Sequence, residues 1–143
     1  MVAQQETPLV SGAATRPSSR LPWCLAWATA VYTVLLVFAT HYPRPQEILG
    51  TGPDLPTDKT MHVVAYGILG LLASATLAAW GRWTLQNVIG LAAALALLGG
   101  LDEITQPIFS RTADPLDWIG DCTGIALGMM AVATGRKIRN RDQ

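Results

Sequence analysis

Charge is scarce in this sequence. Only 14% of its 143 residues are Asp, Glu, Lys or Arg, whereas about 25% is usual for a soluble domain. Long uncharged stretches separate the charged clusters, and the formal net charge is zero. The balance gives no indication of a basic nucleic-acid-binding surface, and no nucleic-acid partner is expected. The deficit predicts a bilayer environment, because a charged side chain at the centre of a membrane helix costs about 2.5–3.5 kcal/mol on insertion scales.

Signatures of common soluble enzymes are missing as well. The sequence has no Cys/His zinc spacing, no glycine-rich nucleotide loop and no nucleophile-elbow motif. Its two cysteines, Cys24 and Cys122, are expected near opposite membrane faces as small apolar side chains, without a disulfide between them.

Four apolar runs are present instead, and each has a length that suits a membrane span of about 17–25 residues. They are Leu21 to Ala39, Met61 to Trp80, Leu85 to Leu101 and Leu116 to Thr134. In lipid such runs must be helical, because backbone groups have to pair within the segment. The first run exceeds the usual length of a signal-peptide core, about 7–15 residues, which argues against cleavage. The sequence thus predicts an all-α, integral membrane four-helix bundle.

The placement of Lys and Arg predicts the orientation. Seven lie on one expected side and three on the other: Arg16, Arg20, Arg82, Arg136, Lys137, Arg139 and Arg141 against Arg44, Lys59 and Arg111. Both termini are therefore expected in the cytoplasm, in a multi-pass protein of the cell (plasma or inner) membrane. The predicted organisation is a disordered cytoplasmic tail (1–20), a transmembrane domain (21–136) and a basic cytoplasmic tail (137–143). A tight turn on the inner side is expected at Gly81–Thr84, and the tryptophans that flank it, Trp80 and Trp83, suit an aromatic belt.

Polar residues gather at the ends of three runs, on the expected outer side. Asp58, His62 and Tyr66 are four residues apart, so they share one face of a helix. Asp102 and Glu103 end the third run, where they oppose the helix dipole and need nearby cations. The available cations are Lys59, His62 and Arg111.

The fourth run begins with a capping pattern. Asp114 fits an N-cap and Pro115 fits the first helical position. Asp117 and Asp121 are four residues apart, and the stripe continues through two glycines that match the small-xxx-small packing pattern, Gly124 and Gly128. We expect this stripe to face the interior of the bundle.

This cluster suggests lipid head-group chemistry. Two helix N-termini with Lys59 and Arg111 favour an anion such as a lipid phosphate. His62 would be the acid or base, oriented by Asp58. Asp102 and Glu103 would form a second catalytic group. Tyr66, Gln106, Asp117 and Asp121 would line the pocket. A divalent cation is an open question, with Asp102, Glu103, Asp117 and Asp121 as candidate ligands.

Purely structural roles compete with these. Asp58 could be a first-turn carboxylate and Asp117 part of a capping box. Lys59 and Arg111 could be interfacial anchors, and an Asp–His–Asp cluster could join helices. Ionisable residues inside a membrane are nevertheless a functional-site hypothesis by default.

The same residues resemble the VanZ-like family. The resemblance covers roughly Leu21 to Arg136 and consists of Asp58-Lys59-x-x-His62-x-x-x-Tyr66-x-x-Leu69-Gly70, Asp102-Glu103-x-x-Gln106, Arg111, Asp117, Gly124 and Gly128. It implies a small four-helix membrane protein of a family named for a protein linked to teicoplanin resistance, with a proposed wider relationship to lipid head-group enzymes. Two departures are Phe109-Ser110, where the family often has Pro-Gly, and Asp121, where it often has asparagine.

Three functions remain open at this stage. The first is a site that binds, and in an enzyme would modify, a lipid head group or lipid-linked cell-envelope precursor, as a phosphoesterase or transferase. The alternative is a non-catalytic glycopeptide-resistance or envelope-binding protein. A proton or ion pathway is disfavoured, because the polar residues of the second span, Asp58, His62 and Tyr66, enter from one face of the membrane only.

Overall fold

Residues 20–42, 58–109 and 113–142 are described by the computed structural model. Within them lie four long helices: α1 (Leu21–His41), α3 (Asp58–Ala79), α4 (Leu85–Thr105) and α5 (Pro115–Arg139). A short 3-10 helix, η1 (Gln106–Phe109), follows α4. Each of the four long helices has the length and apolarity needed to cross a membrane. The predicted all-α architecture with four candidate spans is confirmed.

The helices extend past the apolar runs at one end of the bundle. Helix α3 begins at Asp58, before the apolar run that starts at Met61, and α4 continues past Leu101 to Thr105. The predicted placement of Asp58, Asp102 and Glu103 on helices is confirmed, because helical backbone bonding does not require apolar side chains. The consequence is that the polar residues at this end lie on regular helix.

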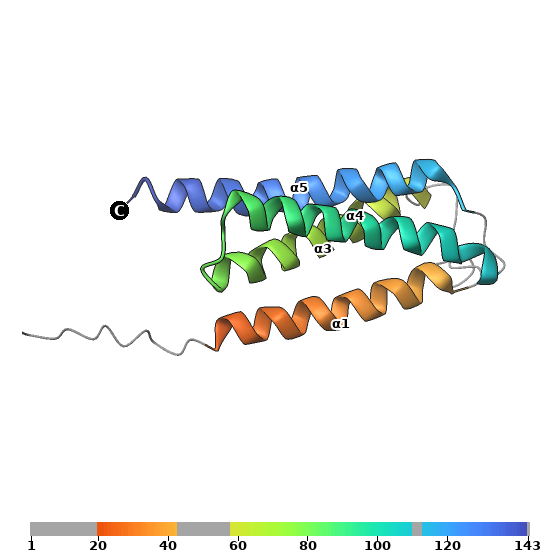
Figure 1. Ribbon diagram of the computed structural model, residues 1–143, viewed down its shortest axis with the longest axis horizontal. Coiled ribbons are helices and arrows are strands. Elements are labelled where there is room, and N and C mark those ends of the chain that lie inside the picture. Colours follow the sequence, from red (N-terminus) through yellow and green to blue (C-terminus); the bar gives the residue numbers. More distant parts are fainter. Residues whose placement is uncertain (1–19, 43–57, 110–112, 143) are drawn as a thin grey trace, which may run out of the picture.

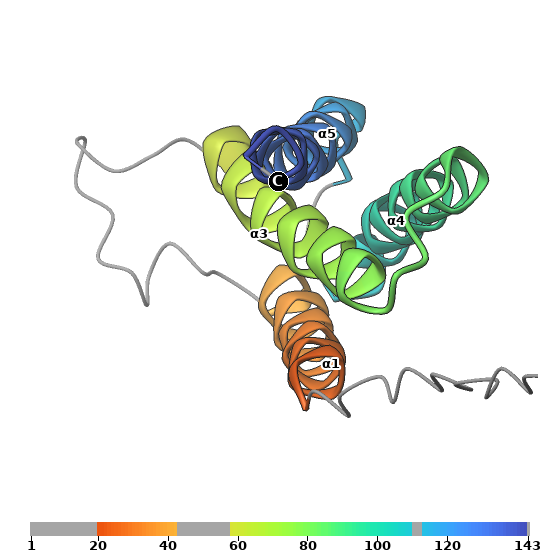
Figure 2. The same ribbon diagram turned by 90° about the vertical axis from the view of Figure 1, so that its left-hand side faces the viewer.

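The four helices run roughly along one long axis (Figure 1). The C-terminal ends of α1 and α4 and the N-terminal ends of α3 and α5 lie together, at the right of that view. Helix α3 packs against each of the other three, and the end-on view shows it between α1 and α5 (Figure 2). We call the end that holds these four helix termini the polar end.

Glycine brings α3 and α5 into backbone contact. A Cβ on Gly124 would collide with the carbonyl oxygen of Val63, and one on Gly128 with that of Gly67. A Cβ on Gly70 would lie 2.7 Å from the carbonyl oxygen of Ile125. The predicted packing role of the Gly124-x-x-x-Gly128 pattern is confirmed, and the close approach fixes which side chains of α3 and α5 face each other.

The opposite end of the bundle is closed by a tight turn. Gly81 adopts φ 68°, its N–H donates to the carbonyl of Ala78, and the N–H of Arg82 donates to that of Leu77. This is the Schellman arrangement of a helix C-terminus. Thr84 then caps α4 by accepting a hydrogen bond from the backbone N–H of Asn87. The predicted turn between the second and third spans is thus observed.

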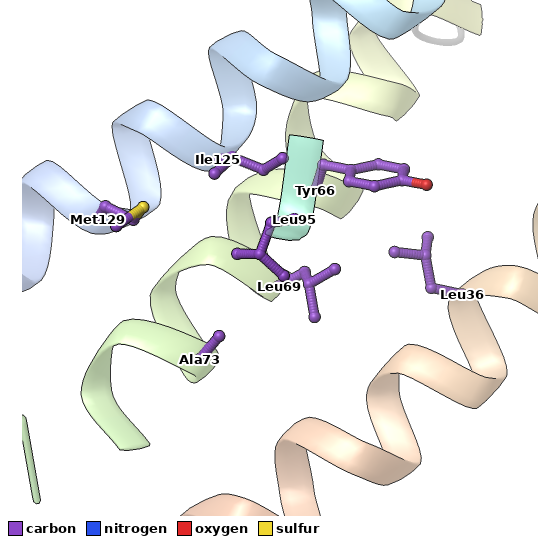
Figure 3. Packing of buried hydrophobic residues seen from close by; sticks show 7 residues of the cluster. All are labelled: Leu36, Tyr66, Leu69, Ala73, Leu95, Ile125 and Met129. Carbon is purple, nitrogen blue, oxygen red and sulfur yellow. The ribbon is translucent and has the colours of Figure 1, made fainter. Parts of the chain in front are cut away.

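The interior of the bundle is small and apolar. Figure 3 shows the seven buried residues of its core: Leu36, Tyr66, Leu69, Ala73, Leu95, Ile125 and Met129. Large apolar side chains elsewhere point outward, such as Trp27 and Leu85, which are 70% and 77% exposed. An apolar exterior around a thin core suits contact with acyl chains. Tyr66, at the edge of the core, leads into the polar end.

Candidate functional site

Buried polar side chains gather at the polar end. They come from every helix terminus there and comprise Thr40 (α1), His62 (α3), Asp102 and Glu103 (α4), Gln106 (η1), and Asp117 and Asp121 (α5). Burying so many polar groups costs free energy unless each finds a partner. Their partners therefore decide what this end can do.

His62 lies at the centre. Its Nδ1 is 2.8 Å from Asp121 Oδ1 and 3.9 Å from Glu103 Oε1. The three residues come from α3, α5 and α4, and all are buried. The aligned stripe that the sequence predicted on α5 does face the interior. A histidine paired with a carboxylate in this way has one ring nitrogen oriented by the carboxylate and the other left for chemistry.

Glu103 links this centre to the start of α5. Its Oε1 accepts a hydrogen bond from Gln106 Nε2 at 2.9 Å, and its Oε2 accepts one from the backbone N–H of Asp114 at 3.1 Å. Asp114 itself caps α5, because its side chain accepts from the N–H of Leu116. The predicted N-cap is confirmed. The alternative in which Asp117 completes a capping box is wrong, because the backbone N–H of Asp114 donates to Glu103 Oε2 and not to Asp117.

Lys59 lies at the rim of the site. Its ammonium donates to Asp114 Oδ2 at 2.6 Å and to Asp117 Oδ1 at 3.2 Å, and its side chain remains 49% exposed. Hydrogen bonds from this ammonium and from the N–H of Leu116 hold the pKa of Asp114 below its usual value. Lys59 thus neutralises carboxylates while still facing outward, where an anion could reach it.

A second histidine, which the sequence analysis missed, lies on α1. His41 Nδ1 is 3.2 Å from Asp102 Oδ1, and its Nε2 is 2.8 Å from the hydroxyl of Thr105. The hydroxyl of Thr40 donates to the same Asp102 oxygen at 2.7 Å. The available signal was the Thr-His pair directly after the first apolar run. An apolar groove of about 620 Å³ between α1 and α4 reaches His41 and Asp102 and includes Phe38 in its lining.

Three buried oxygen atoms in the described ranges have no hydrogen-bond partner: the hydroxyl of Tyr66, Oδ2 of Asp102 and Oδ2 of Asp121. The Tyr66 ring stacks on the His62 ring with centroids 6.4 Å apart. Gly99 of α4 gives Asp121 its space, because a Cβ there would lie 3.0 Å from Asp121 Oδ2. The hydroxyl of Tyr66 and the carboxylate of Asp102 lie close to each other. An unpartnered buried polar atom costs about 1–3 kcal/mol, so Asp121 Oδ2 marks a place where a ligand would be stabilised.

Most of the sequence-predicted site residues meet at the polar end: Lys59, His62, Tyr66, Asp102, Glu103, Gln106, Asp117 and Asp121. Arg111 and the side chain of Asp58 lie outside the described residues, so their roles stay predictions. The sequence predicted that Asp58 would orient His62. In the structure the carboxylate beside His62 Nδ1 belongs to Asp121.

In comparisons with known proteins, no family model, no curated protein and no solved structure matches the chain.

Proposed function

We propose that this chain is a VanZ-like protein of the cell (plasma or inner) membrane whose polar end faces the extracytoplasmic side and acts on a lipid head group. Both termini are then cytoplasmic. Basic residues at the other end support this orientation. Arg82 follows α3, and the last turn of α5 contains Arg136, Lys137 and Arg139.

The observation that carries the proposal is the His62–Asp121 pair, whose Nδ1 and Oδ1 atoms lie 2.8 Å apart, buried between α3 and α5 at the polar end. Asp121 would orient the imidazole, and the second ring nitrogen would exchange a proton with the head group. Glu103 would support the charge of the imidazolium from 3.9 Å.

A phosphorylated head group, on a phospholipid or a lipid-linked envelope precursor, suits the surroundings. Helices α3 and α5 both point their N-termini to this end, and helix N-termini favour anions. Lys59 adds a full positive charge that remains half-exposed. The acyl chains would stay in the bilayer beside the apolar exterior of the helices.

Turnover of phospholipids and of polyprenyl-linked precursors by the purified protein in nanodiscs tests the proposal, with released head groups measured by mass spectrometry. His62→Ala should lower the rate by about 10²–10⁴, the usual contribution of a positioned acid or base. Thr29→Val is the matched control. The hydroxyl oxygen of Thr29 lies 3.0 Å from that of Thr76. Thr76 is close to the C-terminal end of α3, which is the end away from the polar end.

Equal rates in wild type and His62→Ala would remove His62 from the mechanism. Lipid binding without turnover, retained in His62→Gln, would instead favour the non-catalytic envelope-binding function. A protein that neither turns over nor binds any of these lipids would refute the proposal.

A further inference from the structure

Three metal-ligating side chains converge at the centre of the polar end. One ligand atom from each of His62, Glu103 and Asp121 lies within 4.8 Å of the other two. They come from α3, α4 and α5, and their exposed fractions are 5%, 5% and 0%. An ion at their centre would need only small side-chain movements to reach bonds of about 2.0–2.2 Å.

A separate observation points to a ligand at this place. Asp121 Oδ2 is fully buried and has no hydrogen-bond partner, although the same carboxylate approaches His62 through Oδ1. A bound cation would satisfy a carboxylate oxygen that the described part of the chain leaves without a donor.

The balance of charge agrees. Among the described residues at the polar end, five carboxylates (Asp102, Glu103, Asp114, Asp117 and Asp121) face one lysine and two histidines, Lys59, His41 and His62. Lys59 is engaged by Asp114 and Asp117, and His41 by Asp102. Glu103 and Asp121 therefore share a single histidine, which leaves room for a cation's charge.

The orientation of Glu103 resembles that of a supported ligand. Gln106 and the Asp114 N–H hold its two oxygens in place from outside the cluster. Such outer partners fix carboxylate ligands in metal sites.

We propose that His62, Glu103 and Asp121 form a binding site for one divalent cation of the Mn²⁺ or Zn²⁺ class. One imidazole and two carboxylates suit these ions, whereas Mg²⁺ prefers an all-oxygen, largely hydrated shell. In the loaded site His62 Nδ1 is a ligand, and the ion replaces its hydrogen bond to Asp121. His62 would then hold the ion instead of exchanging a proton with the head group, so its acid–base role applies only to the metal-free site. Three protein ligands leave positions open for a phosphate oxygen. A role for the ion in lipid turnover rests on the proposed function, but ion binding is measured without lipid.

The test uses full-length protein in detergent, stripped with a chelator and titrated with MnCl₂, with free Mn²⁺ counted by electron paramagnetic resonance. Zn²⁺ is tested in parallel by calorimetry. We expect one tight site for either ion. Its affinity should fall by about tenfold or more in Glu103→Gln, His62→Gln and Asp121→Asn, because changes even to outer partners cost about 10–100-fold.

Asp142→Asn is the matched control. It also removes one carboxylate, but it lies beyond the C-terminus of α5, at the opposite end of the bundle, so ion binding should persist. Variants are accepted only if they elute as the wild type does in size-exclusion chromatography. Should neither ion bind, or should wild type and all three ligand variants bind equally, the metal site is overturned.

The two proposals fail separately. Lipid turnover that survives complete chelation overturns the metal site as a cofactor site and leaves the lipid function standing. A single ligand-dependent ion site in a protein that turns over no lipid supports the metal site and refutes the lipid enzyme.

Discussion

Replacing Gly124 by alanine puts a methyl group where the backbone of α3 lies. The added Cβ would collide with the carbonyl oxygen of Val63 and would also lie 2.8 Å from the nitrogen of Gly67. Both neighbours are helical backbone and cannot turn aside, so α3 and α5 must separate. Overpacking of this kind costs about 1–3 kcal/mol, and a rigid backbone neighbour places the substitution at the upper end of that range.

Gly135→Ala is the matched control on the same helix. A Cβ added at Gly135 would have no neighbour within 4 Å, so only the helix propensity of alanine acts, by up to about 1 kcal/mol in its favour. The two substitutions add the same methyl group to α5 and are expected to change stability in opposite directions.

Unfolding by SDS in mixed micelles, followed by tryptophan fluorescence, gives the free energy of unfolding of each variant. The separation of α3 from α5 should also move His62 away from Asp121. Gly124→Ala should therefore lower the proposed lipid turnover even under conditions where the variant is folded. If Gly124→Ala were as stable as wild type, the backbone contact between α3 and α5 would not exist as described.

Four further predictions concern single contacts and the placement of charge. Thr40→Val removes the hydroxyl that donates to Asp102 Oδ1 at 2.7 Å and should lower the free energy of unfolding by about 1–3 kcal/mol; an unchanged value in the same SDS titration would contradict that bond. Asp114→Ala should lower the thermal midpoint more than Asp114→Asn, because only asparagine can still cap α5. The lowered pKa of Asp114 means that its bond to Lys59 stabilises the fold at neutral pH and is lost as the pH falls through the folded-state pKa, so wild type and Asp114→Asn should converge in acid. A fluorescent protein fused after Gln143 should be fluorescent in cells whereas alkaline phosphatase fused there should be inactive; the reverse pattern would overturn the proposed orientation.

Much of the fold could be predicted because a bilayer leaves few alternatives. Runs of apolar residues have to be helices in lipid, and the cap at Asp114 and the interior stripe from Asp117 to Gly128 follow from local spacing alone. Their observed positions agree with those local rules.

The pairing of side chains across helices could not be predicted in the same way. Asp102 and Glu103 are neighbours in sequence, but successive residues point about 100° apart on a helix. Asp102 therefore meets Thr40 and His41 of α1, while Glu103 faces His62 and the start of α5. The choice of Asp121 as the partner of His62 likewise depends on how α3 crosses α5, which backbone contacts at glycine determine.

The contacts of Glu103 offer a way to detect ligand binding in the buried site from the surface of the protein. One of its oxygens holds the amide hydrogen that begins the segment leading into α5, and the other faces His62. A ligand that draws this carboxylate inward would also displace Asp114 and its exposed neighbour Ala113. An environment-sensitive dye attached at position 113 would then signal occupancy from the water-facing surface, with no need for the ligand itself to be coloured, magnetic or labelled.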